Sequence, residues 1–153
     1  MLSWTTVHSI GRRAMSDDLE AIRQLKARYF RLMDTKRWDE LQRVFIDDAD
    51  IDMTGEGSAH TTTAADFITL LRSMIGEVVT VHHGHMPEIE LTSPDSATGT
   101  WAMEDHLWWP EGSPIRHLHG YGHYHERYVR TDDGWRIASM RLTRLHRTFE
   151  MAD

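Results

Sequence analysis

The stretch Thr80-Val81-His82-His83-Gly84-His85-Met86-Pro87 decides how the rest of the chain is arranged. β-branched residues lead into it, which predicts a β-strand, yet three histidines take positions where a strand usually carries Val or Thr. Successive strand side chains point to opposite faces, so we expect His82 to face inward and line a site while His83 faces outward. Pro87 cannot donate to a ladder, which predicts a sheet edge or a bulge. The alternative is a half-exposed strand with solvated histidines.

The composition limits the kinds of chemistry and partner. The chain has 153 residues, no Cys and a formal net charge of −7. Without Cys there are no disulfides or cysteine nucleophiles, so acid/base chemistry must come from His, Asp, Glu and Tyr. The negative charge argues against nucleic acid or an anionic membrane surface as a partner, and it favours a neutral or apolar small molecule. No apolar run is long enough to span a membrane and no export signal is visible, so we expect a cytoplasmic protein.

The length and pattern predict a single domain. We place it over residues 16–149, after a flexible N-terminal arm, 1–15, and before a short tail, 150–153. Ser16 is the expected N-cap of the first helix. Its apolar stripe at spacings of three and four places Tyr29 in the core and leaves the basic residues, Lys26 among them, largely outside.

Asp34 follows Tyr29 by five residues. On a straight helix the two side chains would lie about 140° apart around the axis. A helix end or a bend is therefore needed for both residues to reach one cavity.

The remaining elements predict an α+β fold. Two shorter helices and an edge strand follow the first helix, and the chain then continues as a meander of long strands joined by turns rich in Pro, Gly, Asp and Ser. Helices followed by an antiparallel meander indicate a curved sheet closing over the helices around a pocket. The expected ranges are 39–45 and 63–75 for the helices, 47–53 for the edge strand, and 78–91, 97–109, 116–130 and 135–148 for the long strands.

Two charged residues fall on apolar strand faces. Asp105 shares the face of Met103, and Arg144 shares the face of Met140. A buried acid needs a partner or a function, so we expect Arg144 to pair with Asp105 or with a ligand oxygen. A purely structural buried salt bridge is the alternative, because structural and functional ion pairs look alike in sequence.

Histidines gather between positions 82 and 125 and suggest a second alternative. His117 and His119, and likewise His123 and His125, lie two residues apart, so each pair shares a strand face. Metal-dependent cupin-like enzymes present ligands in this way. Against that reading, three leading helices are foreign to a cupin, and these histidines fall on the face opposite to Tyr124.

The chain from about Asp17 to Leu145 resembles the SnoaL-like branch of the nuclear transport factor two superfamily. That resemblance implies a cone-shaped α+β barrel, with three N-terminal helices packed in a strongly bent, mostly antiparallel sheet. The resemblance rests on the order and spacing of several short segments. These are Ala27-Arg28-Tyr29 with Asp34, Trp38-Asp39-Glu40-Leu41, Thr80-Val81-His82-His83, Ala97, Gly122-His123-Tyr124-His125-Glu126 and Gly134-Trp135-Arg136-Ile137.

Within the superfamily the chain is most similar to scytalone dehydratase, bile acid 7α-dehydratase and lindane dehydrochlorinase. Those families pair an Asp at the end of the first helix with a His on the long strand, a pair that Asp34 and His82 match. The resemblance also implies site roles for Tyr29, Asp105 and Arg144. Arg141 and Arg147 lie close enough to Arg144 for a small gap to change the last match.

The chemistry implied is cofactor-free and metal-free acid/base catalysis, a dehydratase-like elimination, an isomerisation or a cyclisation, on a hydrophobic ring-shaped molecule such as a steroid or polyketide. His82 would abstract a proton, Asp34 would stabilise the imidazolium, and Tyr29 would donate a hydrogen bond. A non-catalytic module of the same fold that binds a small molecule or dimerises is the alternative. The resemblance further implies a homo-dimer or homo-trimer, and we expect the substrate-binding wall to contain Trp101, Met103, Trp108, Tyr124 and Met140.

Overall fold

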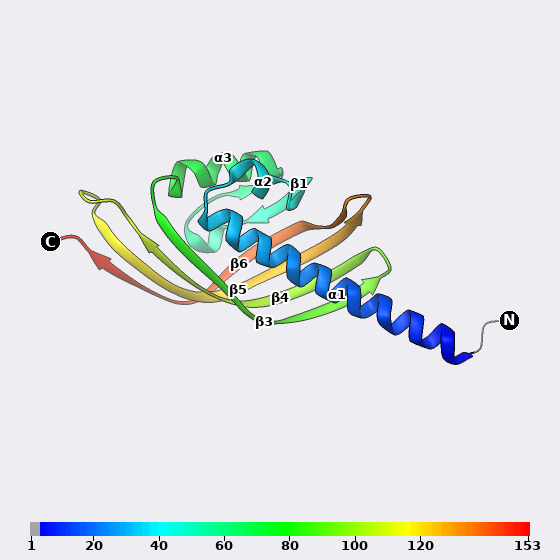
Figure 1. The fold of residues 1–153 in the computed structure, drawn as a ribbon. Helices are drawn as coiled ribbons and strands as arrows, with labels where there is room; N and C mark the ends of the chain where they lie inside the picture. Colours follow the sequence, from blue (N-terminus) through cyan, green and yellow to red (C-terminus); the bar gives the residue numbers. More distant parts are fainter. Residues whose placement is uncertain (1–3) are drawn as a thin grey trace.

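The computed structural model describes residues 4–153, and their side chains from Met15 onward. A single bent sheet curves around three helices, as Figure 1 shows. The sheet order is β2-β1-β6-β5-β4-β3; β1 runs parallel to β6, and the other neighbours pair antiparallel. The α+β cone predicted from the sequence is confirmed. Its elements are α1 (Trp4–Asp34), α2 (Trp38–Gln42), β1 (Phe45–Asp52), the 3-10 helix η1 (Thr54–Glu56), β2 (His60–Thr61), α3 (Ala64–Ile75), β3 (Val79–Ser93), β4 (Ser96–Trp108), β5 (Ile115–Thr131) and β6 (Gly134–Met151).

Helix α1 starts earlier than expected and buries one residue more. It begins at Trp4 rather than at Ser16, so the predicted flexible arm is helical where the structure describes it; residues 1–3 of that arm lie outside the described part. A single Gly inside a helix costs only about 1 kcal/mol, so Gly11 does not end it. Lys26, predicted outside the apolar stripe, is fully buried, because Glu126 of β5 lies opposite it and pairs with its ammonium.

Two element boundaries also differ from the prediction. The second helix ends at Gln42, and Phe45 already belongs to β1, where it pairs with Ile137 of β6. Burial of an aromatic residue in a sheet outweighs its weak helical preference. At the other end of the chain, β6 continues to Met151, so the first two residues of the predicted tail are strand.

Strand β3 is the edge of the sheet, as Pro87 indicated. Its pairing with β4 shifts register between Gly84 and Pro87, which is the predicted bulge. Beyond Gly84 the alternation breaks, and Met86 is 92% exposed. The bulge thus keeps His82 on the inner face while the following segment bends outward.

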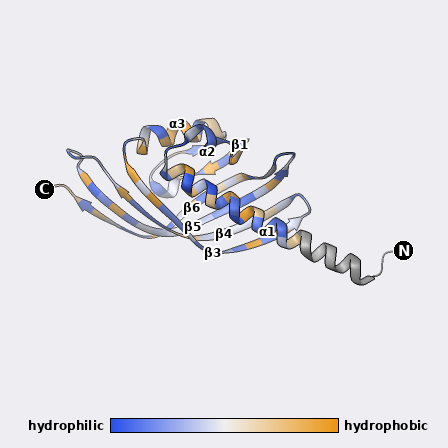
Figure 2. Ribbon diagram, in the orientation of Figure 1, coloured by the Kyte–Doolittle hydropathy of each residue, from blue (hydrophilic) through white to orange (hydrophobic). Residues whose placement is uncertain are grey.

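The hydrophobic core fills the space between the helices and the sheet. Along the long strands hydrophobic and hydrophilic residues alternate, as Figure 2 shows, so one sheet face meets the helices and the other meets solvent. On β5 the even-numbered residues from Leu118 to Tyr128, including Tyr124 and Glu126, are buried and the intervening histidines are not. Among residues 4–153, no helix is long and apolar enough to cross a membrane.

Candidate active site

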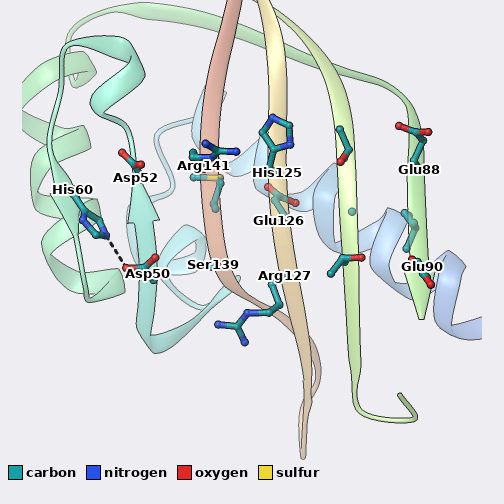
Figure 3. A pocket seen from close by; sticks show the side chains of 15 residues that line it. Asp50, Asp52, His60, Glu88, Glu90, His125, Glu126, Arg127, Ser139 and Arg141 are labelled. Atoms are coloured by element: carbon teal, nitrogen blue, oxygen red, sulfur yellow. Dashed lines mark hydrogen bonds and ion pairs between the residues drawn. The ribbon is translucent and has the colours of Figure 1, made fainter. Parts of the chain in front are cut away.

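Two hollows lie on opposite faces of the sheet. The outer one, with a volume of about 790 Å³, is an open groove across β1, β6, β5, β4 and β3. Figure 3 shows charged side chains spread over its floor, with His60 paired to Asp50. None of the five predicted catalytic residues lines this groove. A broad, solvated, polar depression cannot exclude water, so its size does not make it the better site for a hydrophobic ligand.

The inner hollow lies between the helices and the sheet and measures about 240 Å³. Four of the five predicted catalytic residues line it, and the fifth, Asp34, contacts one of them. The rest of its wall is mostly apolar, with Glu56, Ser58 and Arg147 as the polar exceptions, and it comes from α1, η1 with its flanking loop, α3 and the strands. The lining residues are Tyr29, Met33, Met53, Glu56, Ser58, Phe67, Leu70, Leu71, Met74, Ile75, His82, Asp105, Leu107, Trp109, Leu118, Tyr124, Leu142, Arg144, Arg147 and Phe149.

His82 and Asp34 are in direct hydrogen-bond contact. Nδ1 of His82 lies 2.7 Å from Oδ1 of Asp34, and the His82 backbone N–H donates to Oδ2 over 2.9 Å. The His82 side chain is only 8% exposed. Because Nδ1 faces a carboxylate, we assign the ring proton to Nδ1, which leaves Nε2 as the acceptor. Among the described residues none hydrogen-bonds to Nε2, so this atom is available to a ligand.

The end of α1 positions the carboxylate. Asp34 is the last residue of the helix, and Lys36 then adopts a positive φ of 59° that turns the chain away. Thr80 donates its hydroxyl to Oδ1 of Asp34 over 2.9 Å, and Lys36 donates to that hydroxyl over 2.9 Å. Tyr29 lines the cavity and Asp34 does not, so the two side chains do not share it and Asp34 reaches the site only through His82. Strand β3 supplies the donors that fix the carboxylate.

Tyr29 and Tyr124 form an edge-to-face pair in the wall of the cavity. Their ring centroids are 5.8 Å apart, and each residue is 1% exposed. Burial raises the pKa of Tyr29, and the hydrogen bond with Tyr124 opposes that rise only in part. Burial also raises the pKa of Tyr124. Both phenols therefore remain protonated at neutral pH, and each can donate a hydrogen bond.

Arg144 and Asp105 form the second polar group of the cavity. Glu56, which the sequence did not indicate as a site residue, joins them. Two parallel hydrogen bonds of 2.7 Å run from Arg144 Nη1 and Nη2 to Asp105, and Arg144 also donates to both oxygens of Glu56. Burial alone would lower the pKa of Arg144, but the hydrogen bonds with Asp105 and Glu56 outweigh burial and raise it. Glu56 lies in η1, within a Gly-rich loop whose path no sequence pattern defined.

A bulge in β6 explains why the sequence pattern did not show which of Arg141, Arg144 and Arg147 faces the cavity. Pairing between β5 and β6 shifts register between Tyr121 and Gly122, so the inward parity of β6 changes just after Arg144. Both Arg144 and Arg147 consequently line the cavity, and Arg147 lies 3.5 Å from Glu56. Arg141, the third candidate, instead lines the outer groove.

The structure places one of the five residues expected in the substrate-binding wall in the lining of the inner cavity. Tyr124 lines the inner cavity, whereas Met103 and Met140 are core residues, each 1% exposed, that do not line it. Trp101 is buried, and its indole donates to the Tyr128 hydroxyl over 2.8 Å. Trp108 is 41% exposed and stacks on histidines of the outer face, because it has the opposite parity on β4. The sequence analysis missed the contribution of α3, notably Leu70 and Met74.

A buried ion pair supports the cavity wall from behind. Lys26 Nζ donates to Glu126 over 2.5 Å, both side chains are 0% exposed, and Tyr128 donates to the other Glu126 oxygen over 2.5 Å. The ammonium also lies 4.0 Å from the ring centroid of Tyr29 and 3.6 Å from that of Tyr124. Burial lowers the pKa of Lys26 to about 8, and the charge of Glu126 limits the fall. The pair thus orders the two tyrosines through their ring faces.

The fold and the cavity together define a class of protein. Three helices inside a bent, mostly antiparallel sheet, with a mostly apolar cavity between them, are the fold of the nuclear transport factor two-like proteins. The chain belongs to the SnoaL-like domain family within this class, since residues 14–141 match its family model.

Individual relatives agree with this assignment. A protein named "Probable cyclase FGR4" from Gibberella zeae is 26% identical in an alignment of 143 positions that covers 87% of this chain and 95% of the relative. The crystal structure of the Kfla4162 protein from Kribbella flavida is 28% identical and covers 88% of this chain and 95% of its own, with a TM-score of 0.80. A hexachlorocyclohexane dehydrochlorinase, LinA Type2, shares the fold with a TM-score of 0.81 at 18% identity, covering 93% of this chain and 95% of its own.

Proposed function

We propose that the protein is a cofactor-free acid/base enzyme that abstracts a proton from a small ring-shaped substrate and thereby starts an elimination. The observation that carries this proposal is the His82–Asp34 pair, with Nδ1 of His82 held 2.7 Å from the carboxylate beside an apolar cavity that His82 lines. A histidine oriented by a carboxylate, with its second nitrogen free, is the arrangement that a general base requires.

In the proposed reaction, His82 Nε2 takes a proton from a carbon next to a carbonyl. The electrons of that C–H bond form a new double bond, and the leaving group departs from the adjacent carbon with its bonding pair. Asp34 stabilises the imidazolium that results, and the proton returns to the departing hydroxide or is released to solvent. Tyr29 stays protonated and accepts the hydrogen bond from Tyr124, so its own hydroxyl can donate to the carbonyl oxygen as negative charge develops there.

Arg144 has a positioning role in this proposal rather than a direct one. Its guanidinium N–H groups are already directed at Asp105 and Glu56, so an anionic substrate group would have to displace a carboxylate to reach it. Two carboxylates around one guanidinium also leave this group without spare positive charge. We therefore expect the Asp105–Arg144–Glu56 cluster to shape the cavity and orient polar substrate groups at its edge.

The size of the cavity favours a compact substrate. A volume of about 240 Å³ lies below the roughly 300–1,000 Å³ of pockets that enclose drug-sized ligands. One ring, or two fused rings, suits this volume better than the four rings of a steroid. The names of the relatives, a cyclase and a dehydrochlorinase, agree with a compact ring-forming or ring-bearing substrate, and both reactions can begin with removal of a proton.

Turnover measurements on a small substrate panel test this proposal. The panel contains β-hydroxy and β-halo cyclic ketones, a bicyclic polyketide-like ketone and a steroid, and conversion is followed by the ultraviolet absorbance of the new conjugated double bond. We expect His82→Ala to lose about 10²- to 10⁴-fold in kcat, and Asp34→Asn to fall by orders of magnitude while retaining ligand binding.

His83→Ala is the matched control, because His83 is the next residue on β3 and lines a separate hollow between α1 and β3 instead of the inner cavity. It should retain full turnover. Full activity of a folded His82→Ala protein would remove His82 as the base. Tight binding of panel compounds without conversion by the unmodified protein would instead support the non-catalytic alternative.

A further inference from the structure

Half-buried imidazole and carboxylate groups gather on the outer face of the sheet, away from the proposed catalytic site. Glu104 and His106 belong to β4, and His119 lies directly opposite His106 on β5. Their side chains are 24–27% exposed, so solvent reaches them. The residues between them on β4 and β5, including Asp105, point to the inner face, so the sheet itself separates this cluster from the cavity.

The donor atoms of this cluster lie within the range of a single metal ion. One ligand atom from each of the three residues can be chosen so that all lie within 4.8 Å of one another. Nε2 of His106 is 3.4 Å from Oε1 of Glu104, and Nε2 of His119 is 2.7 Å from the same oxygen. Ligands of a tetrahedral zinc ion at about 2.0–2.1 Å lie roughly 3.3 Å apart. The separation between His106 and Glu104 already matches this ligand–ligand distance. The separation between His119 and Glu104 needs to increase by only a fraction of an ångström.

A neighbouring histidine fixes the orientation of one ligand. Nδ1 of His106 lies 3.0 Å from Nε2 of His117, so a hydrogen bond at Nδ1 leaves Nε2 of His106 as the atom that faces Glu104. Metal-binding histidines are usually held in this way through their second nitrogen. The rings of His106 and His119 now stack with centroids 3.9 Å apart, and metal binding requires them to turn apart, which their partial exposure permits.

We propose that Glu104, His106 and His119 form a binding site for one divalent transition-metal ion of the zinc class. Two imidazoles and one carboxylate match the ligand preference of such ions rather than that of calcium or magnesium, which take oxygen ligands. Three protein ligands leave one position for water. His85, the next imidazole along the face, is 55% exposed and lies 3.5 Å from the other Glu104 oxygen, so we leave it outside the ligand set.

The site is independent of the proposed acid/base reaction. His106 and His119 point to the outer face, and neither residue lines the inner cavity. Loss of metal should therefore leave turnover unchanged, and failure of the proposed enzymatic function would not affect metal binding. We expect the ion to hold β4 and β5 together, so that metal raises the melting temperature.

Zinc titration of the chelator-treated full chain tests the proposal. Calorimetry should show one zinc ion per chain, and cobalt(II), used as a spectroscopic probe, should develop the visible absorption of a tetrahedral site. His106→Ala and His119→Ala should each weaken zinc binding by more than about 10-fold, and the double variant should abolish it. Glu104→Gln keeps the shape of the side chain and should weaken binding too.

His123→Ala provides the matched control, since His123 also lies on β5 with the outward parity but outside the cluster. It should bind zinc normally, and circular dichroism melts of all variants should confirm that they are folded. The proposal is overturned if zinc does not bind at concentrations up to about 1 mM, a range in which even weak metal modules are occupied. It is equally overturned if zinc binding survives in the folded double variant.

Discussion

Replacing Lys26 by Met should cost the protein a large part of its stability. Lys26 and Glu126 are both 0% exposed and 2.5 Å apart, so each neutralises the other inside the core. Methionine has nearly the same length as lysine and fills the same space between the rings of Tyr29 and Tyr124. The substitution therefore removes the charge with little change in packing, and it leaves the Glu126 carboxylate buried with only Tyr128 as a partner.

The expected loss of stability follows from the Glu126 carboxylate, which stays buried after its lysine partner is removed. Removing one member of a buried ion pair typically costs about 3–5 kcal/mol, because the remaining charge is desolvated and unpaired. The contacts of the ammonium with two tyrosine rings add to the lysine's contribution. For a domain of this size, each kcal/mol corresponds to about 2–4 °C in melting temperature. We therefore expect a decrease of roughly 6–20 °C.

Urea unfolding of four proteins measures the effect: the unmodified chain, Lys26→Met, Glu126→Gln and the double variant. In the double variant no buried charge remains at this position, and the Gln carbonyl can still accept from the Tyr128 hydroxyl. We expect it to recover at least half of the loss of the Lys26→Met protein. A loss below about 1 kcal/mol in Lys26→Met, within the range of an exposed ion pair, would refute the reasoning.

Three further predictions concern the site and its supports. In Gly120→Ala, the new Cβ would lie 2.4 Å from Nη1 of Arg144, so we expect a loss of about 1–3 kcal/mol in urea unfolding and reduced turnover; unchanged stability would contradict this. Tyr29→Phe deletes one hydrogen-bond donor and should reduce kcat/KM by a factor equivalent to about 1–3 kcal/mol, less than His82→Ala does. Hydrogen bonding from Arg130 lowers the pKa of Asp18. The stability that this pair provides should therefore be complete above the ordinary aspartate pKa of 3.8 and lost as the pH falls below it. Thermal melts of Asp18→Asn at acid pH should lack that loss.

Much of the fold follows from local patterns that are strong in this chain. Turn residues bound each long strand, and alternation along β4 and β5 correctly separated an inward Asp105 and Tyr124 from the outward histidines. The pairing of Asp105 with Arg144 was also accessible, because both residues continue rows of buried apolar side chains. Buried charges are costly unless they are paired, so each of these two residues has few possible partners other than the other one.

Other features depend on where chain segments meet, which periodicity does not encode. Lys26 is buried because Glu126, a hundred residues later, lies opposite it in the folded chain. Glu56 reaches Arg144 through a loop whose course is set by tertiary packing. Trp108 was expected in the cavity on the strength of its size, although its parity on β4 already placed it with His106 on the outer face.

The register of β4 against β5 keeps two different chemistries apart on one pair of strands. Asp105 pairs with Gly120 and faces the cavity, while His106 pairs with His119 and faces outward. A slip by one residue would exchange the two faces, exposing the apolar wall and burying imidazoles without partners. Gly120 contributes to preventing this slip, because only a residue without a side chain leaves room for the Asp105–Arg144 pair above it. The same glycine therefore supports the Asp105–Arg144 side of the inner cavity and, indirectly, the alignment of the proposed metal ligands on the other face.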